Sequence, residues 1–240
     1  MLHAMLRAAV AKLYGLLGAL SFDGTNQYVD CGDIGSPSNN GWQLTVEARV
    51  RFNSLTGHQT IFCDGGFVRG YEFGIYNGEL HAGVENNDFH RSLGYPISNL
   101  VMGTNYSLAA RFDGVNGSLS ILVDGIEVAR DDTLSAFTDY DGSNGTTIGS
   151  ALTQSPSDNS QLNIGDTNID GLIAEMRVWE GIRTDQEIQD NMLIRLTGNE
   201  AGLYALWPLN ESSGTTASNL AGTTDGTLQN SPTWAPSEVV

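Results

Sequence analysis

Lysine is almost absent from this sequence, and basic residues as a class are scarce. Lys12 is the only lysine, and 11 basic residues stand against 28 acidic ones, which gives a formal net charge of -17 at pH 7. A surface that binds nucleic acid needs clustered lysine and arginine to displace counterions from phosphates. The charge balance therefore argues against nucleic acid as a partner and predicts an acidic, solvated surface, in which acidic loops are the places for a divalent cation.

Cysteine occurs only twice, as Cys31 in "YVDCG" and Cys63 in "IFCDGG". The spacing of the two matches no zinc-binding motif. They would form one disulfide in an exported protein and would stay reduced and buried in one that is not exported. The sequence leaves both alternatives open.

Groups that commonly carry catalysis are few and dispersed. The four histidines, His3, His58, His81 and His90, form no recognisable nucleophile or zinc constellation. The chain also contains no phosphate-binding loop and no dinucleotide-binding fingerprint. We therefore expect a protein that is not an enzyme.

An uninterrupted apolar segment long enough to cross a membrane is missing as well. The first twenty residues, "MLHAMLRAAVAKLYGLLGAL", are interrupted by Arg7 and Lys12, whereas a span needs about 20 apolar residues. A signal peptide needs small residues before its cleavage site, and Leu17 and Leu20 occupy the relevant positions. The segment predicts neither a membrane span nor a cleaved leader.

The same twenty residues carry a helical pattern. Apolar residues recur at alternating spacings of four and three, as on the seam of a coiled coil. An isolated helix of this length is marginal in water, so we expect it to pack against copies of itself or a larger particle. The predicted seam consists of Leu2, Leu6, Ala9, Leu13, Leu16 and Leu20. The chain would thus comprise an oligomerisation or anchoring helix over 1–20 and a second domain over 21–240.

From residue 21 onward the hydrophobic period changes to two, which is the period of β-strands. The segment "QLTVEARVRF", residues 43–52, alternates apolar side chains at even positions with polar ones, such as Glu47 and Arg49, at odd positions. This alternation predicts a half-buried strand. Further strands are predicted over 60–64, 71–76, 79–85, 106–112, 118–123, 126–130, 146–150 and 172–179.

Two turns and one helix connect these strands. Asn77-Gly78 and Asp124-Gly125 predict two-residue hairpin turns, because a type I′ turn needs positive φ at both central residues. The segment "TDQEIQDNMLIRLTG", residues 184–198, predicts a helix that begins with a capping box and ends at Gly198. The capping box consists of Thr184 and Glu187, and the apolar face of Ile188, Met192, Leu193 and Leu196.

The order of these segments carries a resemblance to a known family. The stretches "LSFDGTNQYVDCG", "LTVEARVRF", "YEFGIYNGELHAG", "YSLAARFDGVNGSLSILVDGIEV", "IDGLIAEMRVWEGIRTDQEI" and "GNEAGLYALWPLNESSG" follow one another between about residues 19 and 236. Together they resemble the laminin G and pentraxin branch of the concanavalin A-like lectin/glucanase superfamily. The resemblance implies an all-β jelly-roll sandwich of two curved antiparallel sheets with one short helix at the edge, to which residues 1–20 add an N-terminal α-helix. It also implies packing roles for Trp179, Trp207 and Trp234.

This superfamily includes hydrolases, lyases, lectins and scaffolds, so the residues present must decide the function. The glucanase pattern Glu-x-Asp-x-x-Glu, which would supply two carboxylates on one strand face, is absent. Gly70 and Tyr71 stand where the pentraxin calcium site has its Asp-Asn pair. The resemblance therefore transfers neither a catalytic pair nor the pentraxin calcium site.

Two other acidic loops predict calcium binding. In "DTNIDG", residues 166–171, oxygen-bearing side chains are spaced two apart before a glycine, as in the first half of a calcium loop. Arg177 stands where such a loop would place its bidentate glutamate, so the alternative is a polar turn that leads into a strand. The candidate calcium ligands are Asp166, Asn168 and Asp170 in this loop, and Asp139 and Asp141 in "DYDGSNG".

A glycan would bind at the rim of a sandwich, where connecting loops carry function. The segment "ENNDFHRSLGYP", residues 85–96, predicts a long loop with the mixture of donor, acceptor and aromatic groups that suits a sugar. The alternative is a variable surface loop without a ligand. The candidate glycan contacts are Asn87, Asp88, His90, Arg91 and Tyr95 in this segment, and Tyr140 in a second loop.

These features together predict a non-catalytic, lectin-like display module. Its N-terminal helix would anchor it in a larger assembly, as a decoration or fibre protein on the surface of a virion or another extracellular particle, with attachment to glycans. One alternative is a secreted carbohydrate-binding domain or a module associated with a glycoside hydrolase. Another alternative is a subunit of a self-assembling surface filament or adhesin.

Overall fold

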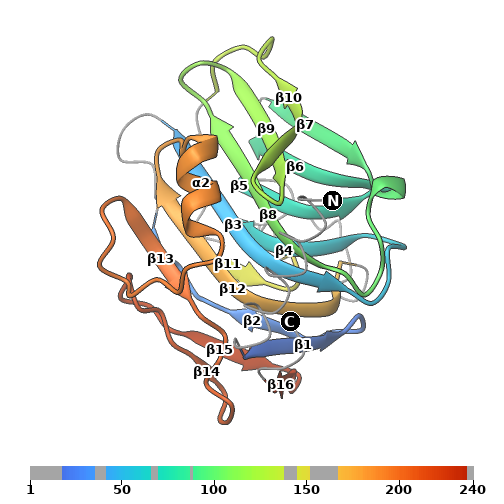
Figure 1. Ribbon diagram of the computed structural model, residues 1–240, viewed down its shortest axis with the longest axis vertical. Coiled ribbons are helices and arrows are strands. Elements are labelled where there is room, and N and C mark those ends of the chain that lie inside the picture. The colour runs from blue at the N-terminus through green and yellow to red at the C-terminus, as the bar shows by residue number, and fades with distance from the viewer. Residues whose placement is uncertain are drawn as a thin grey trace, which may run out of the picture.

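Two antiparallel sheets packed face to face make up the protein (Figure 1). The computed structural model describes residues 18–35, 42–65, 70–86, 89–137, 145–151 and 167–236. Sheet A has the strand order β10 (Ile126–Asp131), β9 (Ser118–Val123), β8 (Asn105–Asp113), β3 (Gln43–Phe52), β12 (Asp170–Glu180), β1 (Ala19–Asp23) and β16 (Thr233–Ala235), and β13 (Leu203–Trp207) also pairs with β12. Sheet B has the order β14 (Thr216–Ala217), β15 (Gly226–Gln229), β2 (Tyr28–Asp30), β11 (Thr146–Ile148), β4 (Gln59–Asp64), β5 (Gly70–Tyr76), β6 (Glu79–Asn86) and β7 (Phe89–Pro96). The predicted sandwich of two antiparallel sheets is confirmed.

The hydrophobic core lies between the two sheets. In β3 the apolar residues of the predicted alternation, for example Val46 and Val50, are fully buried against residues of sheet B such as Phe73 and Ile75. Burial of one such side chain stabilises the fold by about 1.5–3 kcal/mol. Trp179 and Trp207 are buried and Trp234 packs against the core, which confirms packing roles for these three.

Both predicted hairpin turns are present. Asn77 and Gly78 connect β5 to β6 with φ of 50° and 82°, and Asp124 and Gly125 connect β9 to β10 with φ of 51° and 74°. Positive φ at both central residues is the property that selected these dipeptides in the sequence. A 3-10 turn, η1 (Ile97–Asn99), follows β7 before the chain returns to sheet A.

Strand β1 corrects the predicted extent of the N-terminal helix. Ala19 and Leu20 belong to this strand, where Leu20 pairs with Ile173 of β12 and with Trp234 of β16. Leu20 and Phe22 are two positions apart, so strand geometry directs both side chains to the same face, and both are buried in the core. Leu20 is therefore not a seam residue of a helix. The other predicted seam residues, Leu2, Leu6, Ala9, Leu13 and Leu16, lie outside the described residues.

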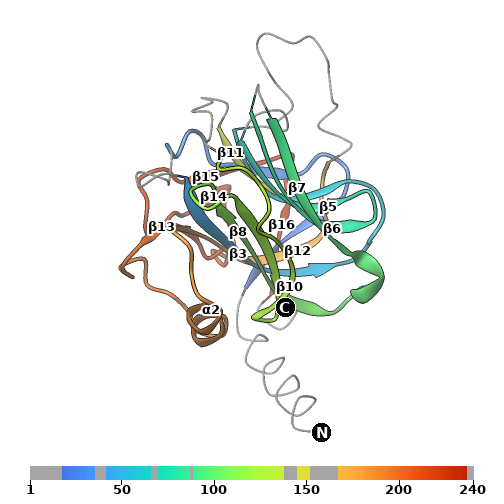
Figure 2. The same cartoon turned by 90° about the horizontal axis from the view of Figure 1, so that it is seen from above.

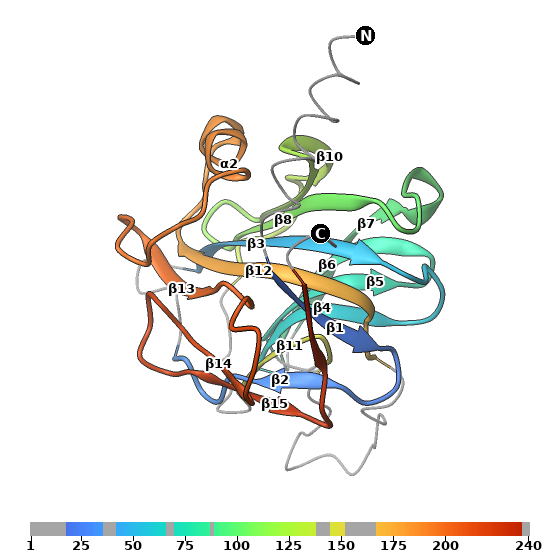
Figure 3. The ribbon, with the colours of Figure 1, turned by 60° about the horizontal axis from the view of Figure 1, so that its bottom comes forward.

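The helix α2 (Asp185–Asn191) lies on the outer face of sheet A, away from sheet B (Figure 3). Its predicted capping box is confirmed, because the Thr184 side chain accepts from the Glu187 amide and the Glu187 carboxylate accepts from the Thr184 amide. The predicted end at Gly198 is wrong by about two turns. Arg177 donates to the carbonyls of Asn191 (3.1 Å) and Ile194 (2.7 Å), so these backbone acceptors serve the arginine instead of a continuing helix.

The outer face of sheet A is buried although it is charged. Glu47 and Arg49, predicted as the solvent-facing side of β3, are 3% and 4% exposed because α2 and the segment after it cover them. They join Glu175 and Arg177 in a network in which Arg177 contacts Glu175 at 2.5 Å and Glu47 at 3.1 Å. Burial raises the pKa of Glu47 above its ordinary value, although the neighbouring guanidinium groups of Arg177 and Arg183 oppose this effect.

Both cysteines are buried, and no disulfide joins them in the part of the chain that the structure describes. Cys31 packs in the core between the sheets, whereas Cys63 follows the inward-facing Phe62 in β4 and lies on the outer face of sheet B. Their positions on opposite faces of one sheet exclude the disulfide alternative in this fold. Burial, followed by the negative charges of Asp30 and Asp64, raises the pKa of the Cys31 thiol well above its ordinary value.

Among the helices that the structure describes, none is both long and apolar enough to span a bilayer.

Candidate functional site

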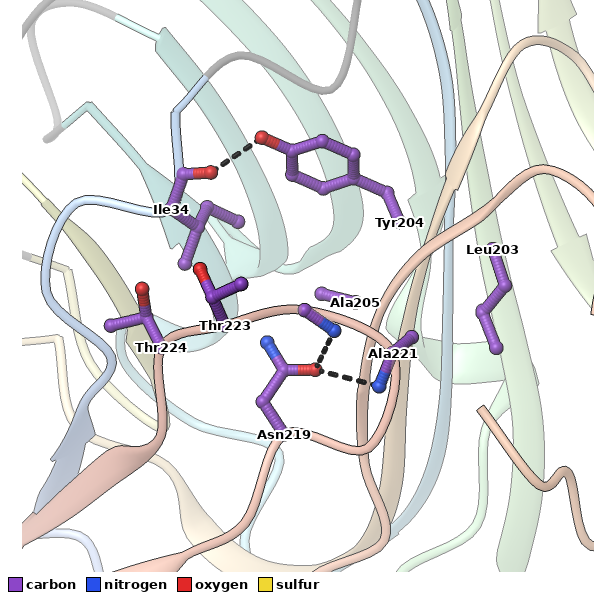
Figure 4. Close-up of a pocket in the computed structure, with 9 residues that line it drawn as sticks. Ile34, Leu203, Tyr204, Ala205, Asn219, Ala221, Thr223 and Thr224 are labelled. Atoms are coloured by element: carbon purple, nitrogen blue, oxygen red, sulfur yellow. Dashed lines mark hydrogen bonds between the residues drawn. The ribbon is translucent and has the colours of Figure 1, made fainter. Parts of the chain in front are cut away.

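A pocket opens where β13 of sheet A meets the β14–β15 end of sheet B (Figure 4). Three segments form it: β13, residues 31–35 after β2, and residues 219–224 between β14 and β15. Its volume is about 290 Å³, at the lower end of the range of small-molecule sites. The lining residues are Ile34, Leu203, Tyr204, Ala205, Asn219, Ala221, Gly222, Thr223 and Thr224.

Tyr204 closes one side of the pocket. Its hydroxyl donates a hydrogen bond to the Ile34 carbonyl, which links β13 to the segment after β2 (Figure 4). Gly35 adopts a φ of 73°, and a Cβ atom there would come within 3.0 Å of the Tyr204 hydroxyl. Burial and the negative charges of nearby carboxylates raise the pKa of Tyr204, so its phenol stays protonated at neutral pH.

Asn219 organises the opposite side. Its Oδ1 accepts hydrogen bonds from the backbone amides of Leu206 (3.1 Å), Ala221 (3.2 Å) and Gly222 (2.8 Å), and the last two form an Asx-type turn. Because Oδ1 accepts these backbone hydrogen bonds, the amide NH2 group at Nδ2 faces the pocket on the side of the two threonines (Figure 4). This side chain is buried, so its orientation is determined by the fold.

The remaining wall combines hydroxyl groups with aliphatic carbon. Thr223 is exposed and Thr224 is half-buried, and both line the pocket beside Ile34 and Ala221. Tyr204, Asn219 and the threonines supply donors and acceptors without formal charge. An apolar wall with a few convergent polar groups is the common composition of a small-ligand site.

The sequence did not point to these pocket residues. The segment "SNLAGTTDG", residues 218–226, has the composition of a turn, and Asx chemistry at Asn219 was readable from it. What brings it beside Tyr204 and Ile34 is the pairing of β13 with sheet A and of β14 and β15 with sheet B.

The predicted glycan-binding loop over residues 85–96 is instead mostly strand. β6 and β7 form a hairpin whose pairs run from Glu79 opposite Pro96 to Asn86 opposite Phe89. Arg91 and Tyr95 stand opposite Val84 and Leu80, which are core residues, and Tyr95 packs against the core. The strand alternation therefore directs these two side chains inward rather than to a rim. His90 belongs to β7, while its side chain, Asn87, Asp88 and Tyr140 lie outside the described residues.

The described part of the predicted calcium loop makes contacts within the fold. Asn168 is buried, and its Nδ2 donates to the Thr25 carbonyl at 2.9 Å. Asp170 begins β12, and its carboxylate accepts from Asn53 at 3.2 Å. Within the described ranges, no group of three His, Cys, Asp or Glu residues is placed to hold a metal ion. The other predicted ligands, Asp166, Asp139 and Asp141, lie outside these ranges, and calcium binding stays a prediction.

A second polar cluster lies on the outer face of sheet B. His58 Nε2 donates to the Glu72 carboxylate at 2.5 Å and the Thr60 hydroxyl donates to the same oxygen at 2.7 Å. The ring of Tyr76 contacts His58 and His81, with centroids 4.9 and 5.5 Å apart. Burial by itself would raise the pKa of Glu72, but the hydrogen bonds and the two imidazoles lower it below its ordinary value.

Comparison with known proteins agrees with this architecture. A family model described as the concanavalin A-like lectin/glucanases superfamily matches residues 23–189. A comparison with curated proteins finds no match.

Several solved structures share the fold. A candidate carbohydrate-binding protein of Bacteroides ovatus is 20% identical with a TM-score of 0.68, over 92% of this chain and 60% of that one, so this chain spans less than two thirds of it. A heptameric SAP-like pentraxin of Limulus polyphemus is 14% identical with a TM-score of 0.59, over 94% and 97% of the two chains. The CBM40 module of a Ruminococcus gnavus sialidase, bound to α2,3-sialyllactose, is 15% identical with a TM-score of 0.54, over 73% and 97%.

At these identities the structural similarities establish the fold alone. The family match, in contrast, covers more than half of the chain and confirms the resemblance drawn from the order of its motifs. The chain belongs to the concanavalin A-like lectin/glucanase superfamily.

Proposed function

We propose that this protein is a non-catalytic carbohydrate-binding module that is displayed from a larger assembly. The observation that carries the proposal is the pocket of Figure 4, where uncharged donors and acceptors converge beside aliphatic carbon. Sugars present hydroxyl groups on a largely apolar ring, so they need this combination.

The fold supports the proposal without deciding it. Two proteins of similar fold are linked to carbohydrates: the Bacteroides ovatus protein is a candidate carbohydrate-binding protein, and the CBM40 module was solved with a bound oligosaccharide. The superfamily also contains enzymes, and function depends on the site rather than the fold. The pocket offers a tyrosine, an asparagine and two threonines. Among its described lining residues, none is a carboxylate that could serve as a glycosidase acid or nucleophile.

A glycan microarray probed with the full chain, with and without calcium, tests the binding. We expect a restricted set of oligosaccharides to bind, and titration calorimetry would then measure each affinity. Thr224→Val removes one pocket hydroxyl at nearly constant volume and should weaken binding about two- to tenfold, the worth of one hydrogen bond. Thr227→Val, at an exposed threonine of β15 outside the pocket, is the matched control and should leave affinity unchanged.

Two results would contradict this proposal. Equal affinities for the Thr224→Val and Thr227→Val variants would remove the pocket from the binding site. Release of new reducing ends from a bound polysaccharide would show an enzyme, because a binding module leaves its ligand intact.

The display part of the proposal rests on the helical pattern of the N-terminal segment and on β1. This strand lies between β12 and β16, so the chain enters the sandwich directly at an interior strand of sheet A. An assembly helix joined there would hold the sandwich at a fixed angle to its support. A virion or another extracellular particle, with the sandwich outward, is the setting that we propose.

A further inference from the structure

We propose that the pocket of Figure 4 accepts uncharged sugar units and rejects sugars that carry a carboxylate or sulfate. This inference rests on the proposed function, because it names the class of carbohydrate that the same site would take. Three observations support it: the charge of the lining, the charge of its surroundings, and the roles left open to the polar groups.

The described lining contains no basic side chain. Of the nine lining residues that the structure describes, none is arginine, lysine or histidine. A bound carboxylate or sulfate is usually held by charge-assisted hydrogen bonds, most often from arginine. An anionic sugar entering this pocket would lose part of its hydration and gain no cationic partner, which makes its transfer costly.

The surroundings of the pocket are negative. The carboxylates of Asp64, Glu180 and Asp33 act electrostatically on Tyr204. The Asp225 carboxylate accepts a hydrogen bond from the backbone N–H of Asn219 at 2.8 Å. The whole chain carries a formal charge of -17. These charges would repel an anionic ligand at close range and during its approach.

The polar groups in the pocket are suited to hydroxyl partners. The proton of the Tyr204 hydroxyl is committed to the Ile34 carbonyl, so its oxygen is left as an acceptor. Asn219 presents Nδ2 as a donor because its Oδ1 is used by three backbone amides. Adjacent hydroxyls of a neutral sugar can donate to one of these groups and accept from the other, whereas a carboxylate can only accept.

The test uses matched pairs of probes that differ only in charge. The methyl ester of α2,3-sialyllactose with native α2,3-sialyllactose, and carboxyl-reduced with native polygalacturonan, are two such pairs, and a microarray supplies others with and without sulfate. We expect the protein to bind the neutral member of each pair. Its affinity for the acidic member should be at least about tenfold lower, a difference of about 1.4 kcal/mol in binding free energy. Equal or tighter binding of acidic members would overturn the inference and leave the proposed function standing. No binding to either member of any pair would overturn both the inference and the proposed function.

A charge placed in the pocket should change this preference. Thr223 is exposed on the pocket wall, so Thr223→Lys can be made without disturbing the core. We expect this variant to bind the acidic members at least about tenfold more tightly than the wild type does. Thr227→Lys adds the same charge on β15 outside the pocket and controls for the effect of net charge. Equal gains in the two variants would overturn the assignment of selectivity to the pocket.

Discussion

Glu72 shows how one side chain of this fold depends on its neighbours. It is 7% exposed on the outer face of sheet B and accepts hydrogen bonds from His58 and Thr60. A buried carboxylate without such partners would be strongly destabilising. The lowered pKa of Glu72 means that the folded state favours the ionised form.

This coupling predicts the effect of pH on stability. Since the folded pKa of Glu72 lies below the unfolded value of about 4.3, its contribution is present above that value and is lost as pH falls through the folded pKa. Glu72→Gln should lower the free energy of unfolding by about 1–3 kcal/mol at pH 7, and should reduce the loss of stability as pH falls below the unfolded value of about 4.3.

Urea denaturation of both proteins across this pH range provides the measurement. Glu79→Gln, at an exposed carboxylate of β6, is the control and should behave like the wild type. A variant curve parallel to that of the wild type at every pH would show that the Glu72 carboxylate does not titrate with folding.

At the scale of the element, the sequence determines where α2 begins, and tertiary contacts determine where it ends. The capping box determines where it begins, and Ile188 packs against Ala109 and Leu122 of sheet A. The helix ends at Asn191, whose carbonyl accepts from the buried Arg177, and the Ile194 carbonyl beyond the helix accepts from the same arginine. The helix is therefore a cover for a charged sheet face as well as an amphipathic element.

The N-cap of α2 gives a prediction at this scale. Thr184→Ala removes both the acceptor for the Glu187 amide and the hydroxyl that donates to the Glu187 carboxylate. The free energy of unfolding should fall by about 1 kcal/mol. Chemical denaturation at 25 °C measures it, with Thr215→Ala, at an exposed threonine outside any helix, as the control. Equal stabilities of the two variants would mean that the cap does not stabilise the helix.

At the scale of the whole molecule, the position of β1 determines how the display proposal can be tested. A deletion of residues 1–17 leaves β1 complete, whereas a deletion of residues 1–20 removes Ala19 and Leu20 from this interior strand of sheet A. The display proposal predicts that the full chain forms an oligomer and that the shorter deletion gives a folded monomer. Light scattering would measure the molar mass of each form in solution. The same number of subunits in both forms would contradict assembly through the N-terminal segment.

The longer deletion serves as its structural control. Leu20 is fully buried, and loss of such a side chain costs about 2–5 kcal/mol. Residues 21–240 alone should therefore unfold at a lower temperature than residues 18–240. Equal melting temperatures would mean that Ala19 and Leu20 do not contribute to the core as their burial indicates.

The sequence by itself determined the class of fold. Two-residue alternation in segments such as 43–52, the turn dipeptides at Asn77 and Asp124, and the capping box of Thr184 are local signals, and each holds in the structure. Local signals succeed because they depend on backbone conformation and the nearest neighbours along the chain.

Only the tertiary structure decided which residues meet. The polar composition of residues 85–96 predicts a loop, whereas pairing with β6 makes most of this segment the strand β7. Leu20 fits a helical seam as well as a strand, and its partners Ile173 and Trp234 are more than 150 positions away along the chain. The pocket joins Ile34, Tyr204 and Asn219 in the same way. Contacts between distant segments leave no local periodicity, so sheet pairing and packing had to bring these residues together.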